Sequence, residues 1–352
     1  MKVLVTGHRG YIGSVLVPIL LRWGHEVVGA DSDLFTSCTF VSPFAGETSA
    51  MSIPSISRDV RDLEPEDFDG IEAVVHLANL SNDPLGNLDP DLTYEINHRA
   101  SVHLARLARV AGVKRFVFAS SCSLYGSAGA DLVNETAAFN PATAYGAAKV
   151  LAERDIAPLA CDTFSPVFLR NATVYGVSPR LRFDLVVNNL TAWAMATGEV
   201  KMKSDGSALR PLVHVADVCE AVRLALEAPR ELIHNEAFNV GATSENYRIR
   251  DVAALVSAEV PGTIVTCTSN APPDERSYRV DFSKIKERLG FEVTFLLADG
   301  VRELRDALKD ADIGPGQFEG VAFQRIARLQ SLMNSGQVRP DLRPAAPLAI
   351  AA

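Results

Sequence analysis

Residues 1–13 read MKVLVTGHRGYIG, and this stretch decides the fold that the rest of the chain completes. The apolar run at residues 3–6 is typical of a buried strand, and the apolar side chains that follow recur at helical spacing until Gly24. Residues 26–31, EVVGAD, then predict a second strand. A strand, a helix and a strand within about 30 residues form a βαβ unit, which requires a parallel sheet with a right-handed crossover.

The same alternation continues through the first half of the chain. Further strands are predicted at residues 55–60, 73–77, 115–119 and 166–169, with helices at 92–111 and 144–159. Six strands that alternate with helices predict an α/β fold with a Rossmann-type, doubly wound parallel sheet.

Beyond residue 170 the alternation loosens, and we expect a smaller, mixed α/β substrate-binding lobe over the carboxyl ends of the strands. Its predicted helices are residues 185–197, 217–227, 250–259, 281–289, 299–309 and 318–333, and its short strands are 200–203, 212–215, 238–240 and 263–266. The expected division gives residues 1–170 to a dinucleotide-binding domain, with 211–241 returning to it, and 171–210 and 242–338 to the lobe. Residues 339–352 are rich in proline and alanine, so we expect a poorly ordered tail.

Composition excludes several classes of protein. The 352 residues carry a net charge of −9, with 34 Lys and Arg against 43 Asp and Glu, which argues against a nucleic-acid partner. No apolar run reaches the roughly 18 residues that a membrane span needs, so we expect no membrane association and a cytoplasmic location. The five cysteines are widely spaced without a C-x-x-C pair, and the histidines lack a metal-binding spacing, so we expect neither disulfides nor a metal site.

The three glycines of the opening stretch, Gly7, Gly10 and Gly13, predict a dinucleotide site because they follow a strand and open a helix. In this context the first glycine makes the turn, the second lets the backbone approach a pyrophosphate, and the third brings the helix against the sheet. The helix N-terminus supplies free N–H groups and a partial positive charge for the phosphates.

The choice between NAD and NADP depends on two residues. Asp31 ends the second strand, where a carboxylate accepts hydrogen bonds from the adenosine ribose hydroxyls and repels a 2′-phosphate, which favours NAD. Arg9 leaves NADP open, because an arginine in the glycine turn can pair with a 2′-phosphate.

Candidate catalytic residues follow at two later sites in the chain. Tyr145 and Lys149 are four residues apart in a predicted helix and therefore share one of its faces. A tyrosine of ordinary pKa about 10 is a poor base at neutral pH, but a neighbouring ammonium and a cationic nicotinamide both lower that pKa. Ser121 follows a predicted strand and is expected to hydrogen-bond the reacting oxygen, while Lys149 also holds the nicotinamide ribose.

These motifs together resemble the extended short-chain dehydrogenase/reductase family. They comprise the three glycines, Asp31, Asp59-Val60, HLAN at 76–79, Asn97, SSCSLYG at 120–126, Tyr145-x-x-x-Lys149 and RPLVHVADV at 210–218. They occur in the family's order from residue 1 to about residue 311. The chain is most similar to the nucleotide-sugar epimerase and dehydratase branch, which UDP-galactose 4-epimerase typifies.

The resemblance implies a role for each matching residue. Ser121, Tyr145 and Lys149 are the implied catalytic triad. The implied cofactor-binding residues are Gly7, Gly10, Tyr11, Ile12, Gly13, Asp31, Asp59, Val60, Leu77, Ala78, Asn79, Asn97, Tyr145 and Lys149. The implied substrate-binding residues, which grip a nucleotide-diphosphate sugar, are Ser121, Thr173, Asn189, Arg210, Asp274, Arg276 and Tyr278. The family also implies a homodimer.

Departures from the family pattern bear on the reaction. Dehydratases of this branch carry an acid where this chain has Cys122 and Ser123, and neither residue supplies a carboxylate. Thr173 stands where epimerases have an asparagine, the nearest being Asn171. The first hypothesis is an NAD-dependent epimerase that acts at C4 through a transient 4-keto sugar. The alternatives are an NAD(P)H-dependent reductase of a 4-keto nucleotide sugar, which Arg9 and Thr173 leave open, and a non-catalytic dinucleotide sensor.

Overall fold

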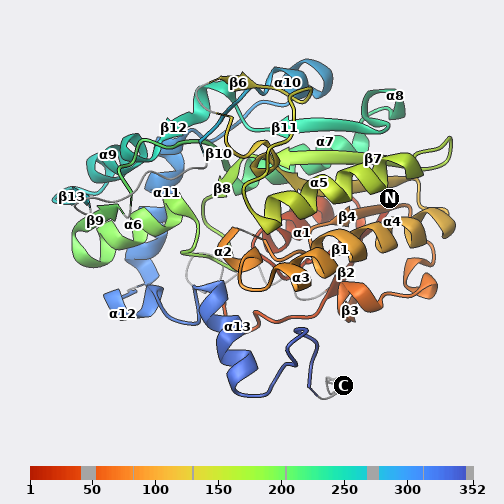
Figure 1. The fold of residues 1–352 in the computed structure, drawn as a ribbon, viewed down its shortest axis with the longest axis horizontal. Coiled ribbons are helices and arrows are strands. Elements are labelled where there is room, and N and C mark those ends of the chain that lie inside the picture. Colours follow the sequence, from red (N-terminus) through yellow and green to blue (C-terminus); the bar gives the residue numbers. More distant parts are fainter. Residues whose placement is uncertain are drawn as a thin grey trace.

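The computed structural model describes residues 1–40, 53–81, 83–128, 131–202, 204–267, 277–311 and 313–345. Within these residues the central sheet has seven parallel strands in the order β11-β7-β5-β4-β1-β2-β3 (Figure 1). Their bounds are β1 Lys2–Thr6, β2 Glu26–Asp31, β3 Ser55–Ser57, β4 Ala73–His76, β5 Arg115–Ser121, β7 Ser165–Asn171 and β11 Glu236–Val240. The predicted doubly wound parallel fold is confirmed.

The strand order reverses at β1. The chain passes from β1 to β2 on one side and then returns to place β4 on the other side, where it continues to β5 and β7. A reversal of this kind leaves a crevice beyond the carboxyl ends of β1 and β4, because the two connections leave the sheet in opposite directions. The glycine turn begins at the end of β1 and therefore opens into this crevice.

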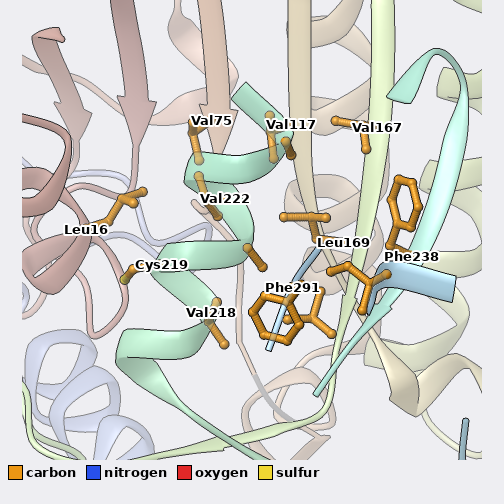
Figure 2. Close-up of a cluster of buried hydrophobic side chains, with 14 of the residues drawn as sticks. Leu16, Val75, Val117, Val167, Leu169, Val218, Cys219, Val222, Phe238 and Phe291 are labelled. Atoms are coloured by element: carbon orange, nitrogen blue, oxygen red, sulfur yellow. The ribbon is translucent and has the colours of Figure 1, made fainter. Parts of the chain in front are cut away.

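Helices cover both faces of the sheet, and each face follows the alternation of side chains along the strands. On one face α1 (Gly13–Arg22) and α7 (Val215–Glu227) pack against residues such as Val75 and Val117, as Figure 2 shows. On the other face α4 (Ser101–Val110) and α5 (Ala144–Ile156) share a second apolar cluster with the alternate strand residues. Burial on both faces explains why the strands are almost continuously apolar.

The smaller lobe is built around a third apolar cluster, to which its three long helices contribute. These are α6 (Val186–Thr197), α9 (Ile249–Glu259) and α11 (Leu297–Ala311). Its strands form two small sheets, β12-β10-β8 and β13-β9, with bounds β8 Thr173–Tyr175, β9 Glu199–Met202, β10 Leu209–His214, β12 Asn246–Arg248 and β13 Ile264–Cys267. Strand β11, from the segment expected to return to the first domain, pairs with β7 in the central sheet.

Short elements complete the described chain. They are α2 Asp83–Gly86, α3 Pro90–Thr93, α8 Arg230–Ile233, α10 Ser283–Leu289, α12 Pro315–Phe318, α13 Arg325–Asn334, β6 Leu132–Val133 and β14 Arg279–Val280, the last two paired with each other. Among the described residues, none of the helices combines the length and apolar character that a membrane crossing requires.

The single helix predicted over residues 318–333 is wrong. The chain turns at Gly320 instead, and α13 starts only at Arg325. The turn allows two aromatic residues on either side of it to pack on one ring, because Phe318 and Phe323 lie 6.1 and 4.8 Å from Phe183 between ring centroids.

The expected disorder of residues 339–352 is also wrong for residues 339–345. Leu342 is 3% exposed, the Arg339 N–H donates to the Arg343 carbonyl at 2.8 Å, and Arg343 pairs with Asp62 at 2.9 Å. Proline and alanine content predicted a loose tail, but a single buried leucine and a paired arginine fix this part of it. Residues 346–352 lie outside the described residues.

Candidate active site

A cavity of about 720 Å³ opens at the carboxyl ends of the central strands. Residues at or just after these ends line it, including Thr6, Asp31, Leu77, Ser121 and Asn171. Residues of the smaller lobe form the rest of the wall, so that one cavity is shared by both parts of the molecule. This is the position at which open α/β sheets bind ligands.

The glycine turn forms a cradle that has no room for side chains. A Cβ on Gly7, which has φ +73°, would lie 2.8 Å from the Ala78 nitrogen, and a Cβ on Gly13 would lie 2.3 Å from the Gly7 carbonyl oxygen. The helix that follows, α1, has no side-chain cap at its N-terminus. Bare backbone and uncapped N–H groups at a helix N-terminus fit a pyrophosphate, so the residues present fit a dinucleotide.

Asp31 lies beside the cradle at the end of β2. Its carboxylate accepts hydrogen bonds from the backbone N–H groups of Arg9 at 3.0 Å and Asp33 at 2.8 Å, and burial raises its pKa. The Arg9 guanidinium donates to Asp33 at 2.7 Å. Arg9 is therefore engaged by a carboxylate, and in this arrangement it gives no specific support to an NADP site.

Most other residues predicted to bind the cofactor also line the cavity. These are Gly10, Tyr11, Ile12, Asp59, Val60, Leu77, Ala78, Asn79, Tyr145 and Lys149. The Tyr11 hydroxyl points away from a cofactor role, since it donates to the Gly176 carbonyl at 2.6 Å and so joins the glycine turn to the smaller lobe. Asp59 accepts hydrogen bonds from the Arg61 guanidinium at 2.8 Å.

Asn97, also predicted to bind the cofactor, lies behind the cavity wall that the structure describes. Asn97 is fully buried in a π-helical segment, Tyr94–Ala100, and is not part of the cavity wall. Its amide accepts from the Leu80 N–H at 2.8 Å and donates to the Leu80 carbonyl at 2.9 Å. Both polar atoms are satisfied by one residue of the loop that follows β4, so Asn97 positions that loop.

The three predicted catalytic residues line one region of the cavity. Ser121 ends β5, and its hydroxyl donates to the Ser123 hydroxyl at 3.1 Å. Tyr145 lies in the first turn of α5, where the Thr143 side chain caps the helix by accepting from the Gly146 N–H at 3.2 Å. The Lys149 ammonium lies 5.8 Å from the centroid of the Tyr145 ring.

Lys149 is almost completely buried. Its ammonium donates to the Asn79 side-chain oxygen at 3.0 Å and to the Ala119 carbonyl at 2.5 Å. Burial lowers the pKa of Lys149 from 10.5 to about 7, with the Glu153 carboxylate opposing this effect. The Lys149 amine therefore has a pKa close to neutral pH, which is typical of groups in proton-transfer sites.

The segment between β4 and α4 packs directly on Tyr145. A Cβ on Gly86 would lie 2.9 Å from the Tyr145 Cβ, so only glycine permits this approach. The Thr93 hydroxyl donates to the Gly86 carbonyl at 2.8 Å. Gly86 and Thr93 therefore hold this segment against Tyr145.

Four of the residues predicted to bind substrate, in addition to Ser121, line the cavity from the smaller lobe side and β8. They are Thr173, Asn189, Arg210 and Tyr278. The Arg210 guanidinium is buried and lies 5.6 Å from the centroid of the Tyr278 ring. Asp274 and Arg276 lie outside the described residues.

Several polar residues of the cavity wall were not expected from the sequence: Asn171, Ser123, Arg182, Asp184 and Arg325. The Asn171 side-chain oxygen is buried without a hydrogen-bond partner among the described residues. Asn171 ends β7 and pairs with Ser121, which ends the neighbouring strand β5. The strand pattern could therefore have indicated that Asn171 lies beside Ser121 in the cavity.

Among the residues that the structure describes, no group of three His, Cys, Asp or Glu side chains is arranged to bind a metal ion. Cys122, beside the catalytic serine, is fully buried and its thiol donates to the Arg170 carbonyl at 3.1 Å. Burial raises the pKa of the Cys122 thiol well above its usual range, which makes it a packing residue and a poor nucleophile.

Sequence comparisons agree with this geometry. The model of the NAD dependent epimerase/dehydratase family matches residues 3–241. UDP-glucose 4-epimerase of Mycolicibacterium smegmatis is 31% identical over 317 residues, which cover 86% of this chain and 96% of the relative. UDP-glucose 4-epimerase of Bacillus subtilis is 28% identical, with coverage of 83% and 92%.

Structural comparisons give the same result. MoeE5 in complex with UDP-glucose and NAD superimposes with a TM-score of 0.75 at 29% identity, over 89% of this chain and all of that one. UDP-glucose 4-epimerase of Thermotoga maritima with UDP-glucose gives a TM-score of 0.75 at 26% identity, with coverage of 89% and 100%. The chain belongs to the NAD-dependent epimerase/dehydratase family, in the UDP-galactose 4-epimerase-like branch of the extended short-chain dehydrogenases/reductases, and its cofactor is NAD.

Proposed function

We propose that this chain interconverts the C4 epimers of a UDP-hexose, with UDP-glucose and UDP-galactose as the first pair to test. The observation that carries the proposal is that the glycine cradle, Asp31 and the residues Ser121, Tyr145 and Lys149 line one cavity with Arg210 and Tyr278. Two of the relatives described above are UDP-glucose 4-epimerases that align over almost their whole length, which supports this choice of sugar nucleotide.

Each residue of the catalytic region has a defined task in this reaction. Tyr145 takes the proton of the C4 hydroxyl and later returns it to the same oxygen when C4 is reduced again. Ser121 donates a hydrogen bond to that oxygen throughout. Lys149 places its positive charge near the tyrosine ring and stabilises the phenolate. NAD held at the glycine cradle would supply a reversible hydride acceptor for C4, and the open cavity would let the 4-keto sugar turn over before C4 is reduced again.

The substrate diphosphate is assigned to the smaller lobe. Arg210 is buried on β10 beside Tyr278, and a planar guanidinium matches phosphate oxygens bidentately. Asn189 on α6 lines the same cavity, and its amide donates to the Phe183 carbonyl at 2.7 Å. These residues would hold the nucleotide while the sugar ring turns over between them and Tyr145.

The experiment is a product analysis with the protein as purified. Released dinucleotide is identified by mass spectrometry, and UDP-glucose, UDP-galactose, UDP-glucuronic acid and dTDP-glucose are each tested for conversion by chromatography without added cofactor. We expect retained NAD and conversion between UDP-glucose and UDP-galactose. A 4-keto nucleotide sugar with added NADPH is assayed in parallel, and its conversion without turnover of the four other substrates would favour the reductase over the epimerase.

A matched pair of variants tests the catalytic assignment. Tyr145→Phe removes only the hydroxyl and is expected to lower the rate by about 10²- to 10⁴-fold, the range for a general base. Tyr247→Phe removes a hydroxyl that donates to Glu245 at 3.3 Å, outside the cavity wall, and is expected to leave the rate unchanged. A sensor would keep its binding output in Tyr145→Phe and would show no turnover in wild type, whereas equal turnover in both proteins would mean that Tyr145 is not the base.

We propose that the protein is a homodimer, the assembly that the family suggests, and that it acts in the cytoplasm. Light scattering coupled to size exclusion measures the mass of the particle, and a mass of one chain at micromolar concentration would contradict the dimer.

A further inference from the structure

The C-terminal segment, residues 325–343, covers part of the cavity although it lies beyond the family-matching residues 3–241. Figure 1 shows α13 on the side of the molecule where β3 ends the central sheet. Leu329 and Leu342 belong to the apolar cluster that includes Val60, and Arg325 and Leu342 both line the cavity. We call residues 325–343 the C-terminal strap.

Arg325, the first residue of the strap, has a donor that the described protein does not use. Its side chain is 97% buried, since only 3% of the residue is exposed. One terminal nitrogen, Nη2, donates to the Arg180 carbonyl at 2.8 Å, and the guanidinium lies 4.6 Å from the centroid of the Phe35 ring. The other, Nη1, is buried without a hydrogen-bond partner among the described residues.

The surroundings of Arg325 are rich in positive charge. Arg180 and Arg182 lie nearby, and Arg182 is already paired bidentately with Asp184 at 2.8 Å. Burial, followed by the charge of Arg182, lowers the pKa of Arg325 to about 10, so it remains a cation at neutral pH. A buried cation with an unsatisfied donor is costly unless an anion completes it.

We propose that Arg325 binds the diphosphate of the NAD cofactor and that the C-terminal strap retains the dinucleotide in its site. The N-terminus of α1, which has no side-chain cap, lines the same cavity and would supply the other donors to that diphosphate. The cofactor is the proposed occupant because the Arg325 guanidinium lies 4.6 Å from the centroid of the Phe35 ring, in the segment that follows β2 and Asp31. Arg210, which is proposed to hold the substrate, lies instead on β10 beside Tyr278.

Ion pairs latch the strap to the segment that follows β3. The Arg343 guanidinium donates to both oxygens of Asp62 at 2.9 and 3.0 Å, and Arg61 donates to the Asp341 carbonyl at 2.7 Å. Arg61 also holds Asp59, a residue of the cavity wall. Arg61 therefore joins the strap directly to a residue of the cavity wall.

The test compares two arginines of α13. Arg325→Met keeps the apolar contact with Phe35 and removes the charge, whereas Arg328→Met makes the same change at a side chain that is outside the cavity wall. Both proteins are stripped of dinucleotide and titrated by calorimetry with NAD, ADP, adenosine and UDP, and their melting temperatures are recorded without ligand.

We expect Arg325→Met to weaken NAD and ADP by about tenfold to a hundredfold, the range for a hydrogen bond to a charged group. Adenosine and UDP should bind as in wild type, Arg328→Met should match wild type throughout, and Arg325→Lys should recover part of the loss. The unliganded melting temperature of Arg325→Met should not fall, since an uncompensated buried charge is removed.

Two results would overturn the proposal. A lower unliganded melting temperature with unchanged NAD affinity would make Arg325 a structural residue, and a loss of UDP affinity alone would assign it to the substrate. The proposal rests on NAD as the cofactor and not on the identity of the sugar. Failure of the sugar assay therefore leaves these binding measurements unaffected, and failure of the binding measurements leaves the epimerase assay unaffected.

Discussion

Two buried cations face the same cavity, and they differ in how completely the protein satisfies them. In the catalytic region Lys149 donates to Asn79 and Ala119, and burial brings its pKa down to about 7. In the C-terminal strap Arg325 keeps one nitrogen without a partner among the described residues, and burial lowers its pKa to about 10.

The two pKa values distinguish Lys149, whose charge changes near neutral pH, from Arg325, which stays positively charged there. An amine with a pKa near 7 gains and loses a proton easily, which suits a residue that tunes a neighbouring base. A guanidinium cannot be neutralised at physiological pH and presents fixed donors, which suits a site for phosphate. Burial alone therefore does not determine the function of a cation. The function depends on whether the surrounding protein satisfies all of its hydrogen-bond donors or leaves one for a ligand.

The pH dependence of stability gives the largest expected effect. Between pH 7 and 10.5 the folded protein releases the Lys149 proton while the unfolded chain keeps it, so the free energy of unfolding rises with pH. The contribution is about 1.4 kcal/mol per pH unit, or ~4 kcal/mol across the window. Lys149→Met should lack this rise and be more stable than wild type at pH 6.

Urea unfolding of the cofactor-free proteins from pH 6 to 10.5 measures this difference. Lys309→Met, at an exposed position, is the control and should follow wild type. Parallel curves for wild type and Lys149→Met would show that Lys149 keeps an ordinary pKa and would remove the contrast with Arg325.

Gly86→Ala tests whether the packing of Gly86 against Tyr145 fixes the position of the tyrosine. The added Cβ would meet the Tyr145 Cβ at 2.9 Å, so either the loop or the tyrosine must move. A misplacement of about 1 Å costs roughly 10²-fold in rate, and we expect a loss of this order in kcat with NAD affinity unchanged. Gly316→Ala, at a position with open space for a Cβ, is the control. Unchanged kcat would mean that the loop adjusts without moving Tyr145.

Leu342→Ala tests the apolar part of the strap. Leu342 is 3% exposed and lines the cavity. Part of its apolar contact would be lost, and we expect dissociation of NAD to accelerate by about tenfold. Stopped-flow displacement by excess ADP-ribose measures the rate. A rate equal to wild type would restrict cofactor retention to Arg325.

Arg343→Met tests the latch and gives the smallest expected effect. The paired Asp62 side chain is 47% exposed, and exposed ion pairs contribute about 0 to 1 kcal/mol. Release of NAD should accelerate by less than about fivefold, and the difference from wild type should disappear at high salt because solvent ions screen the pair. Acceleration that persists in high salt would contradict an electrostatic latch.

The first half of the molecule was predictable because its signals are local. The glycines, Asp31 and the Tyr145–Lys149 spacing each fix a backbone shape or a shared helix face within a few residues. The prediction of one helix at residues 318–333 failed because long-range packing interrupts it, and two aromatic rings pack on Phe183 there. The hydrogen bonds of Asn97 to Leu80 were likewise not visible in the sequence.

From the amino-acid sequence alone the doubly wound sheet and the glycine cradle could be predicted, and Ser121, Tyr145 and Lys149 could be proposed as catalytic residues. Hydrophobic periodicity and the absence of a Cβ act on neighbouring residues, so they are visible along the chain. Folding was needed to show that Arg9 pairs with Asp33 and that Arg325 donates to the Arg180 carbonyl at the cavity wall. These outcomes depend on which groups meet after folding, because the free energy of a buried cation is set by its neighbours, and Arg180 lies 145 residues before Arg325 in the chain.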